Sequence, residues 1–483
     1  MKRNSLTTAV VAGIAGVAGF AGLANAVDLN PDGLGQVLIY PYYTVNKSQD
    51  TLFSVVNTDP VNGKAVKVRF LEGYNSREVL DFNLYLSPND VWTATVTQSG
   101  DETSAAQVAT TDNSCTDPSV LDNGPILFRT AAFDGSSVIP GDDGPQTADR
   151  TREGYIELIS MGDVPPGTTL AGLITHVDSV PPGCGSISDA IASADVVAPT
   201  GGLFGEADIV NVGQGTLFAY TADAIDGFSA LPLYSPSSNL LPSLQSANSA
   251  EATNGIARAY VFINGGQLVV ADYAFGEYAV SAVYMSDALY NEYIVSPGLG
   301  ANTDWIVTFP TKRFYVDDAL YGPGTPFPPF TQSFTDGQSN VVVAPSIYDR
   351  EEATTVVQGD FSPPISATPN SLPYEVNVIS FLADTGAGDP SGVLGSLLRP
   401  NIPPFASAGW MKLDLFGGEP GHQLPGGVTP AGADVDFNGL PATGYMAFNV
   451  INANANPGLL ANYGGLFRHR ASRSCVGADP ACS

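Results

Sequence analysis

The chain has 483 residues, of which 48 are acidic and 19 are basic, so its formal net charge is −29. Such a charge repels phosphate backbones and anionic lipids, which argues against nucleic-acid binding and against a basic membrane-surface function. Hydrophobic residues make up 44% of the chain, enough for a substantial core, so the protein is not a disordered acidic tail.

The first 26 residues have the pattern of a secretory signal peptide. Two basic residues precede an apolar stretch over 9–23, which ends at the small-x-small sequence Ala24-Asn25-Ala26. No later apolar run is long enough to cross a membrane as a helix. We therefore expect residues 1–26 to be removed and the mature chain to have no integral membrane segment. Its expected location is the periplasm, the cell surface or the extracellular medium.

Alternating apolar and polar residues predict four consecutive strands over 51–97. In "KAVKVRF", for example, Val68 and Phe70 fall on the face opposite Lys67 and Arg69, and "EGYNS" and "SPND" supply turns. We expect an antiparallel meander that forms one sheet of a β-sandwich.

The strand "GQVLIYPYYTV" just upstream contains Pro41, which lacks a backbone donor and so belongs at a sheet edge or a bulge. An open edge there would allow pairing with a second copy, although pairing within its own sheet is the favoured alternative. Residues 99–153 and 178–202 are rich in Gly, Ser, Asp and Pro and predict long loops, and "LAGLITHV" before the second loop resembles a strand.

One helix is predicted at about 277–295, from apolar residues spaced by three and four: Tyr278, Ala282, Met285, Leu289 and Tyr293. Strand patterns resume after it. The predicted fold is mainly β, an antiparallel β-sandwich or sandwiches with long loops and this one amphipathic helix. We divide the mature chain into an N-terminal sandwich region (27–200), a mixed segment (201–300) and a β-rich region (301–483) that either stands alone or completes the first sandwich.

Four cysteines, Cys115, Cys184, Cys475 and Cys482, remain after cleavage, and export favours their pairing. Three connectivities are open. A small C-terminal loop closed by Cys475 and Cys482 would leave Cys115 to pair with Cys184. Neither spacing resembles a zinc site or a redox C-x-x-C motif, so we expect structural disulfides.

Two short segments have oxygen-bearing side chains at positions 1, 3 and 5 followed by glycine, as in a calcium loop. Both lack the glutamate of position 12 and flanking helices, and ordinary turns share the pattern. Structural calcium is the only cofactor that the sequence indicates. The candidate ligands are Asp28, Asn30, Asp32, Asp434, Asp436 and Asn438.

The motif "LPATG" over 440–444 matches the pentapeptide that sortases cleave, and a basic cluster lies downstream at 468–473. The segment between them contains several asparagines and cannot lie in a membrane, so the match is accidental. No nucleotide-binding, zinc-protease or serine-hydrolase motif is found, and we predict no catalytic residues.

The segments "GLGQVLIYPYYTV", "REVLDFNLYLSPNDVWTA" and "TDWIVTFPTKRFYV" are similar to a group of uncharacterised exported proteins of Gram-negative bacteria, often labelled hypothetical or cell-surface proteins. The resemblance spans most of the mature chain. It implies compartment and lineage, and it supplies no catalytic residues.

Our leading hypothesis is a secreted or surface-exposed, non-catalytic β-sandwich protein that acts in binding or assembly at the cell envelope. Its partner would be an envelope or extracellular protein, a glycan, or another copy. One alternative is a polysaccharide-active enzyme or carbohydrate-binding module that uses loop carboxylates and aromatics such as Tyr42, Tyr43 and Trp305. Another is a self-assembling surface-layer or filament subunit.

Overall fold

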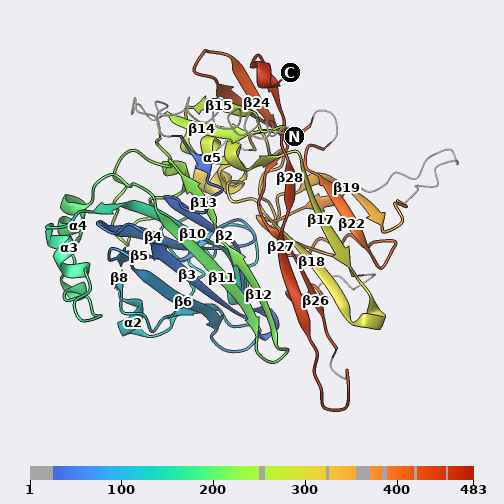
Figure 1. Cartoon of the computed structure of the whole chain (residues 1–483), viewed down its shortest axis with the longest axis horizontal. Coiled ribbons are helices and arrows are strands. Elements are labelled where there is room, and N and C mark those ends of the chain that lie inside the picture. The colour runs from blue at the N-terminus through green and yellow to red at the C-terminus, as the bar shows by residue number, and fades with distance from the viewer. Residues whose placement is uncertain are drawn as a thin grey trace, which may run out of the picture.

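The chain folds into several antiparallel sheets joined by loops and short helices, as shown in Figure 1. This computed structural model describes seven ranges of the chain: 26–249, 256–322, 326–354, 370–382, 389–417, 421–452 and 455–482. The predicted mainly β class is confirmed. The strands of the N-terminal half and those of the C-terminal half lie on opposite sides of the molecule in Figure 1.

A seven-stranded sheet forms the centre of the N-terminal half, in the order β1-β13-β2-β10-β4-β5-β8. Each neighbouring pair is antiparallel. Its strands are β1 (Asp28–Leu29), β2 (Val37–Thr44), β4 (Gly63–Glu72), β5 (Glu78–Leu86), β8 (Cys115–Asp117), β10 (Glu153–Val164) and β13 (Asp223–Asp226).

A six-stranded sheet packs against it, in the order β12-β11-β3-β6-β7-β9. Aromatic rings fill the space between the two sheets: the rings of Phe53 and Phe70 lie 5.7 Å apart, as do those of Phe82 and Trp92. These two sheets form a β-sandwich. The strands of the second sheet are β3 (Asp50–Asn57), β6 (Val91–Gln98), β7 (Ala106–Ala109), β9 (Ile126–Leu127), β11 (Leu203–Asn211) and β12 (Thr216–Thr221).

The four strands predicted over 51–97 exist, but the single meander is wrong. Strands β3 and β6 pair with each other in the six-stranded sheet, whereas β4 and β5 form a hairpin in the seven-stranded sheet. The chain therefore crosses between the sheets twice. The prediction that Pro41 lies at a sheet edge or a bulge is confirmed in its second form, because the register between β2 and β10 shifts opposite Pro41. Strand β2 lies between β13 and β10, so the favoured alternative of pairing within its own sheet is correct and the open edge is not.

Both faces of the seven-stranded sheet are covered, which the sequence pattern did not indicate. The predicted solvent-facing residues Lys67 and Arg69 are buried. Lys67 forms an ion pair of 2.5 Å with Asp81, and Arg69 forms ion pairs with Glu78 and Glu157. Charged side chains on this face are thus neutralised by carboxylates of neighbouring strands, and Lys67 also donates to the Pro236 and Ser237 carbonyls.

The C-terminal half contains two five-stranded sheets, a four-stranded sheet and a two-stranded sheet. Strand orders are β14-β15-β23-β24-β29, β20-β19-β22-β17-β28, β21-β18-β26-β27 and β16-β25. The bounds in chain order are β14 (Ala257–Phe262), β15 (Leu268–Tyr273), β16 (Met285–Ser286), β17 (Ala288–Ile294), β18 (Ala301–Thr308), β19 (Val341–Asp349), β20 (Asn370–Leu372), β21 (Val376–Ser380), β22 (Ala408–Asp414), β23 (Gln423–Val428), β24 (Asp434–Asn438), β25 (Leu440–Pro441), β26 (Tyr445–Val450), β27 (Tyr463–Arg468), β28 (Arg470–Ser472) and β29 (Cys475–Gly477).

The helix predicted at 277–295 is correct only in its first half. Helix α5 spans Gly276–Tyr284 and is almost wholly buried, and the chain then extends into strands β16 and β17. The stretch "LAGLITHV", predicted as a strand, begins with helix α3 (Thr169–Ile174), where the Thr168 side chain accepts from the Ala171 N–H as an N-cap.

The other α-helices in the described ranges are short. They are α2 (Val120–Asn123), α4 (Asp189–Asp195), α6 (Arg313–Val316) and α7 (Asp318–Tyr321). Among the described residues there is no helix long and apolar enough to cross a membrane. Contacts join the two halves of the chain: Thr308 Oγ1 donates to the Pro41 carbonyl at 2.6 Å, and one apolar core contains residues from both halves.

Candidate functional site

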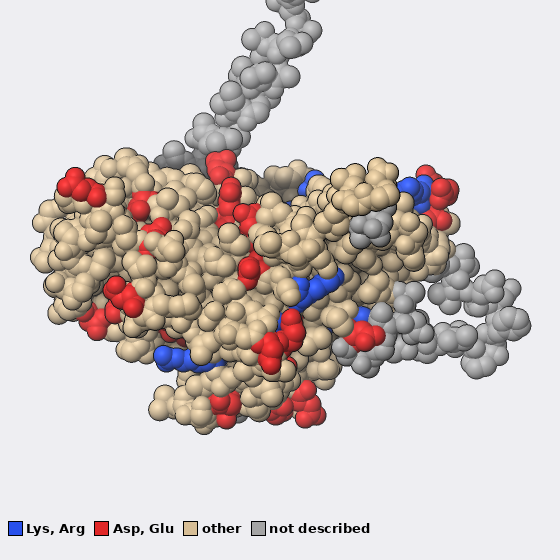
Figure 2. Space-filling model, turned by 90° about the horizontal axis from the view of Figure 1, so that it is seen from below, with Lys and Arg blue, Asp and Glu red and all other residues tan. Residues whose placement is uncertain are grey.

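Nearly half of the basic side chains in the described ranges lie inside the protein. Eight of those in the described ranges are buried, namely Lys64, Lys67, Arg69, Arg77, Arg150, Arg152, Lys312 and Arg313. Eight carboxylates of the described ranges are buried as well, so burial removes equal numbers of positive and negative charges and leaves the acidic excess at the surface: Glu72, Glu153, Glu157, Asp163, Asp223, Asp304, Asp317 and Glu375. Figure 2 shows acidic side chains spread over one face and basic side chains at a few separate places.

A buried ion cluster connects the two halves of the chain. Glu157 on β10 accepts from Arg69 Nη1 at 2.7 Å and from Arg313 Nη2 at 2.9 Å, and its side chain is fully buried. Arg313 belongs to α6, whereas Arg69 belongs to β4. Solvent does not reach these groups, so we interpret the cluster as structural.

The first calcium candidate, residues 28–33, begins on strand β1 with Asp28 and continues into a turn. Asn30 Oδ1 accepts from the Asp32 N–H at 2.9 Å, and Asn30 Nδ2 donates to the Leu34 carbonyl. Asp28 lies opposite Asp226 in the sheet, and burial, together with the charge of Asp226, raises the pKa of Asp28 to about 6. The amide of Asn30 therefore already closes this turn.

The second candidate, Asp434, Asp436 and Asn438, lies along strand β24 and not in a loop. Side chains two residues apart on a strand are separated by about 7 Å, so these three do not converge on one position. Asp436 accepts from the Gly426 N–H, and Asn438 accepts from Gln423. Within the described ranges, no group of three or more His, Cys, Asp or Glu side chains is placed to hold a metal ion.

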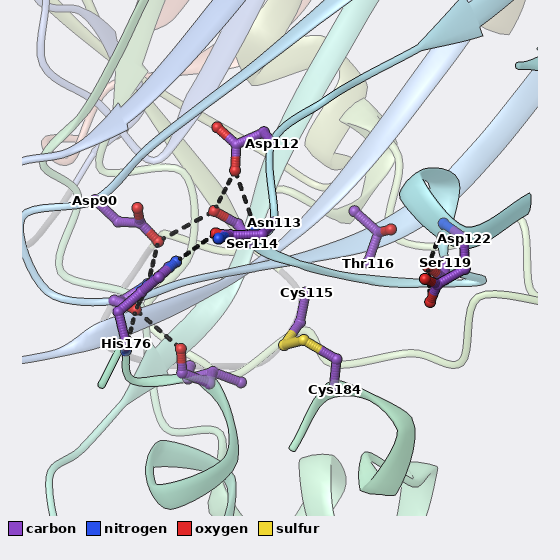
Figure 3. Close-up of a disulfide and its surroundings, with 12 residues drawn as sticks. Asp90, Asp112, Asn113, Ser114, Cys115, Thr116, Ser119, Asp122, His176 and Cys184 are labelled. Carbon is purple, nitrogen blue, oxygen red and sulfur yellow. Dashed lines mark hydrogen bonds and ion pairs between the residues drawn. A yellow bond between two sulfur atoms is a disulfide. The ribbon is translucent and has the colours of Figure 1, made fainter. Parts of the chain in front are cut away.

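The cysteines form two disulfides, Cys115–Cys184 and Cys475–Cys482, which is one of the three connectivities that the sequence left open. Figure 3 shows the first, which links strand β8 to the segment just before α4. Disulfides of this kind indicate an oxidising, non-cytoplasmic compartment.

Near this disulfide, His176 is surrounded by polar groups that superficially resemble a hydrolase triad (Figure 3). Its Nδ1 lies 2.6 Å from Ser87 Oγ and 3.7 Å from Asp90 Oδ2, while Nε2 lies 3.0 Å from Asn113 Oδ1. A catalytic triad needs the hydroxyl and the carboxylate at opposite ring nitrogens. Here both are at Nδ1, and Ser87 Oγ also donates to the Ile174 carbonyl, so we interpret the group as a loop anchor.

Tyr42, Tyr43 and Trp305, which the carbohydrate alternative needs at the surface, are buried, as the other interpretation of them as core residues requires. The hydroxyl of Tyr42 donates to Glu153 at 2.8 Å, and that of Tyr43 donates to the Thr151 carbonyl. Trp305 Nε1 donates to the Glu292 carbonyl at 2.9 Å. These three residues belong to the core and do not form a ligand platform.

A groove of about 540 Å³ lies between the sheet containing β17, β22 and β19 and the hairpin of β26 and β27. We call it the Trp410 groove. Trp410, 40% exposed, stacks on Tyr348 with ring centroids 4.3 Å apart and planes 12° from parallel. Tyr348 thus covers one side of the indole, and Trp410 itself borders the groove.

A second aromatic pair forms the other wall of the Trp410 groove. Phe448 and Phe467 stack with centroids 6.1 Å apart and planes 8° from parallel, and Phe467 is 54% exposed. The carboxylates that line the groove are Glu292, directly opposite Trp410 in the sheet register, and Asp349 and Glu352, which flank Arg350.

Gly409 borders the Trp410 groove and allows strands β19 and β22 to lie close together. A Cβ atom at this position would lie 1.8 Å from the Tyr348 carbonyl oxygen, so any side chain would push β19 away from β22. The groove thus depends on the close approach of these two strands. Its dimensions are within the usual range of small-ligand sites, roughly 300–1,000 Å³.

Comparison with known proteins adds no assignment. No protein-family model matches the chain, and neither the curated proteins nor the solved structures contain a significant match.

Proposed function

We propose that this chain is an exported, non-catalytic binding protein of the cell envelope that holds a neutral glycan in the Trp410 groove. The observation that carries this proposal is the exposed indole of Trp410 on the polar face of a sheet, at the border of a groove with a second aromatic wall. Sugar rings pack their C–H faces on aromatic rings, which combine large apolar area with rigidity.

The polar groups of the groove fit this ligand class. Carboxylates accept hydrogen bonds and match the hydroxyl donors of a sugar. Three carboxylates and one guanidinium line the groove, so its formal charge is negative and disfavours uronic acids or sulfated chains. A neutral polysaccharide or oligosaccharide is the ligand that satisfies both features.

Compartment supports the same proposal. The N-terminal pattern is that of a signal peptide, and two disulfides indicate an oxidising location. Envelope and extracellular glycans are abundant outside the cytoplasm, and an acidic surface favours solubility there.

Binding to a panel of neutral polysaccharides by affinity electrophoresis tests the proposal. We expect at least one polysaccharide to retard the wild-type protein and Trp410→Ala to weaken the interaction about tenfold or more, roughly 1.4 kcal/mol. Phe275→Ala is the control, since Phe275 is 60% exposed and lies outside the groove. Equal retardation of wild type and Trp410→Ala would overturn the proposal, and release of reducing ends would overturn its non-catalytic part.

A further inference from the structure

A cavity of about 400 Å³ lies on the other side of β27 from the Trp410 groove. Three arginines within six residues line it, Arg468, Arg470 and Arg473, and we call it the arginine pocket. Its remaining wall comes from the start of the described chain, β13 and the turn after β14. Three of the chain's 19 basic residues thus converge on one cavity of a protein with 48 acidic residues.

The positive charges of the arginine pocket are only partly compensated. Arg468 Nη2 forms an ion pair of 2.6 Å with Asp223, the one carboxylate among the lining residues. In the ranges that the structure describes, neither Arg470 nor Arg473 has a carboxylate within ion-pair distance. The charge of Asp223 also acts on Arg473, but one carboxylate faces three guanidinium groups, so the pocket has an excess of two positive charges.

The surroundings of Arg473 are unfavourable in two respects, its hydrogen bonding and its charge. Its Nε is buried and has no hydrogen-bond acceptor among the described residues. Burial, and then the positive charge of Arg468, lower the pKa of Arg473. A buried donor without an acceptor and a like-charge neighbour both cost free energy, and a bound anion would relieve both.

We infer that the arginine pocket binds the oxyanion of a phosphate group. Guanidinium groups present forked donors that match phosphate oxygens in pairs, and a net charge of two fits a phosphate monoester dianion. The phosphate source is inorganic phosphate, a phosphorylated sugar or a lipid headgroup, which share this chemistry.

This site is independent of the proposed glycan groove. Successive strand residues point to opposite faces, so Phe467 borders the Trp410 groove while Arg468 borders the arginine pocket. Loss of one site therefore leaves the other in place, and the two proposals fail separately.

Isothermal titration calorimetry with inorganic phosphate, at ionic strength matched with chloride, tests the inference. We expect one phosphate to bind per chain. In both Arg470→Gln and Arg473→Gln the dissociation constant should be at least tenfold larger than in the wild type. Arg129→Gln, which removes an exposed arginine of another surface region, should bind as the wild type does. Arg468 is left intact because its ion pair with Asp223 contributes to the fold.

Circular dichroism is the folding control for all variants. A variant whose spectrum matches that of the wild type has retained its fold. No phosphate binding, or equal binding by wild type and both pocket variants, overturns the inference. If phosphate binds, glucose 6-phosphate and vesicles containing phosphatidic acid identify its source. Tighter binding of the sugar phosphate supports a phosphorylated glycan, and co-sedimentation with vesicles supports a lipid headgroup. If neither of these two results is obtained, free phosphate is the supported ligand.

Discussion

Replacing the buried Glu157 by Gln should destabilise the protein strongly. The substitution keeps the size of the side chain and removes the charge that neutralises Arg69 and Arg313. Arg69 retains Glu78, but Arg313 has no other carboxylate within ion-pair distance in the described ranges. Breaking a buried pair by removing one partner costs about 3–5 kcal/mol. We expect this loss in the free energy of unfolding of Glu157→Gln.

A matched control separates burial from the loss of charge. Glu102 forms an ion pair with Arg152 at 2.7 Å, but its side chain is 60% exposed. An exposed pair contributes about 0–1 kcal/mol, so Glu102→Gln should be nearly neutral. Urea unfolding followed by circular dichroism measures both variants. If the two variants lose stability within about 1 kcal/mol of each other, burial does not have the role that we assign to it.

Three further predictions concern stability and pH. The double variant Cys115→Ser/Cys184→Ser opens a loop of sequence separation 69. The loop-entropy relation predicts that this lowers the free energy of unfolding, measured with urea, by about 4 kcal/mol. Cys475→Ser/Cys482→Ser, with separation 7, should lower it by about 2 kcal/mol, and the reverse order would contradict that relation. Burial lowers the pKa of His469 from 6.5 to about 4, so its contribution to stability is complete above pH 6.5 and is lost as pH falls through about 4. Urea unfolding measures the free energy of unfolding at pH 7 and at pH 4. Between these two pH values it should fall by roughly 3 kcal/mol more in the wild type than in His469→Gln, and an equal fall in both proteins would contradict this.

The strands were predictable because their pattern is local, whereas their pairing was not. A period of two identifies β3, β4, β5 and β6 from neighbouring residues alone. Which strands share a sheet depends on contacts between distant segments. Lys67 and Arg69 followed the expected alternation, yet the face they share is covered by residues far along the chain. The presence of a charged residue in an alternating strand therefore did not indicate that its side chain is exposed to solvent.

The helix prediction failed for a specific geometric reason. Leu289 and Tyr293 are four residues apart, a spacing that places side chains on one face of a helix and also on one face of a strand. Tyr278 and Ala282 do lie in α5, but the later pair lies in β17. Spacings of four alone cannot distinguish the two structures, and the change from helix to strand falls between Tyr284 and Met285.

One feature of the Trp410 groove is visible in the sequence, namely the position of Trp410 in an alternating strand. In "GWMKLDLF" the alternation places Trp410 on the same face as Lys412 and Asp414, so the pattern alone predicts an indole on a polar face. The opposite wall, with Phe448 and Phe467, is brought to Trp410 only by tertiary contacts. The sequence therefore contained half of the site, and the fold supplies the rest.

Acrylamide quenching of tryptophan fluorescence tests the central claim most directly. The chain has three tryptophans, and Trp92 and Trp305 are fully buried, so the quenchable emission comes from Trp410. Our account predicts that a saturating neutral oligosaccharide lowers quenching to the level of Trp410→Phe, because the sugar covers the indole. Unchanged quenching in the presence of a bound oligosaccharide would place the binding site elsewhere and contradict the account.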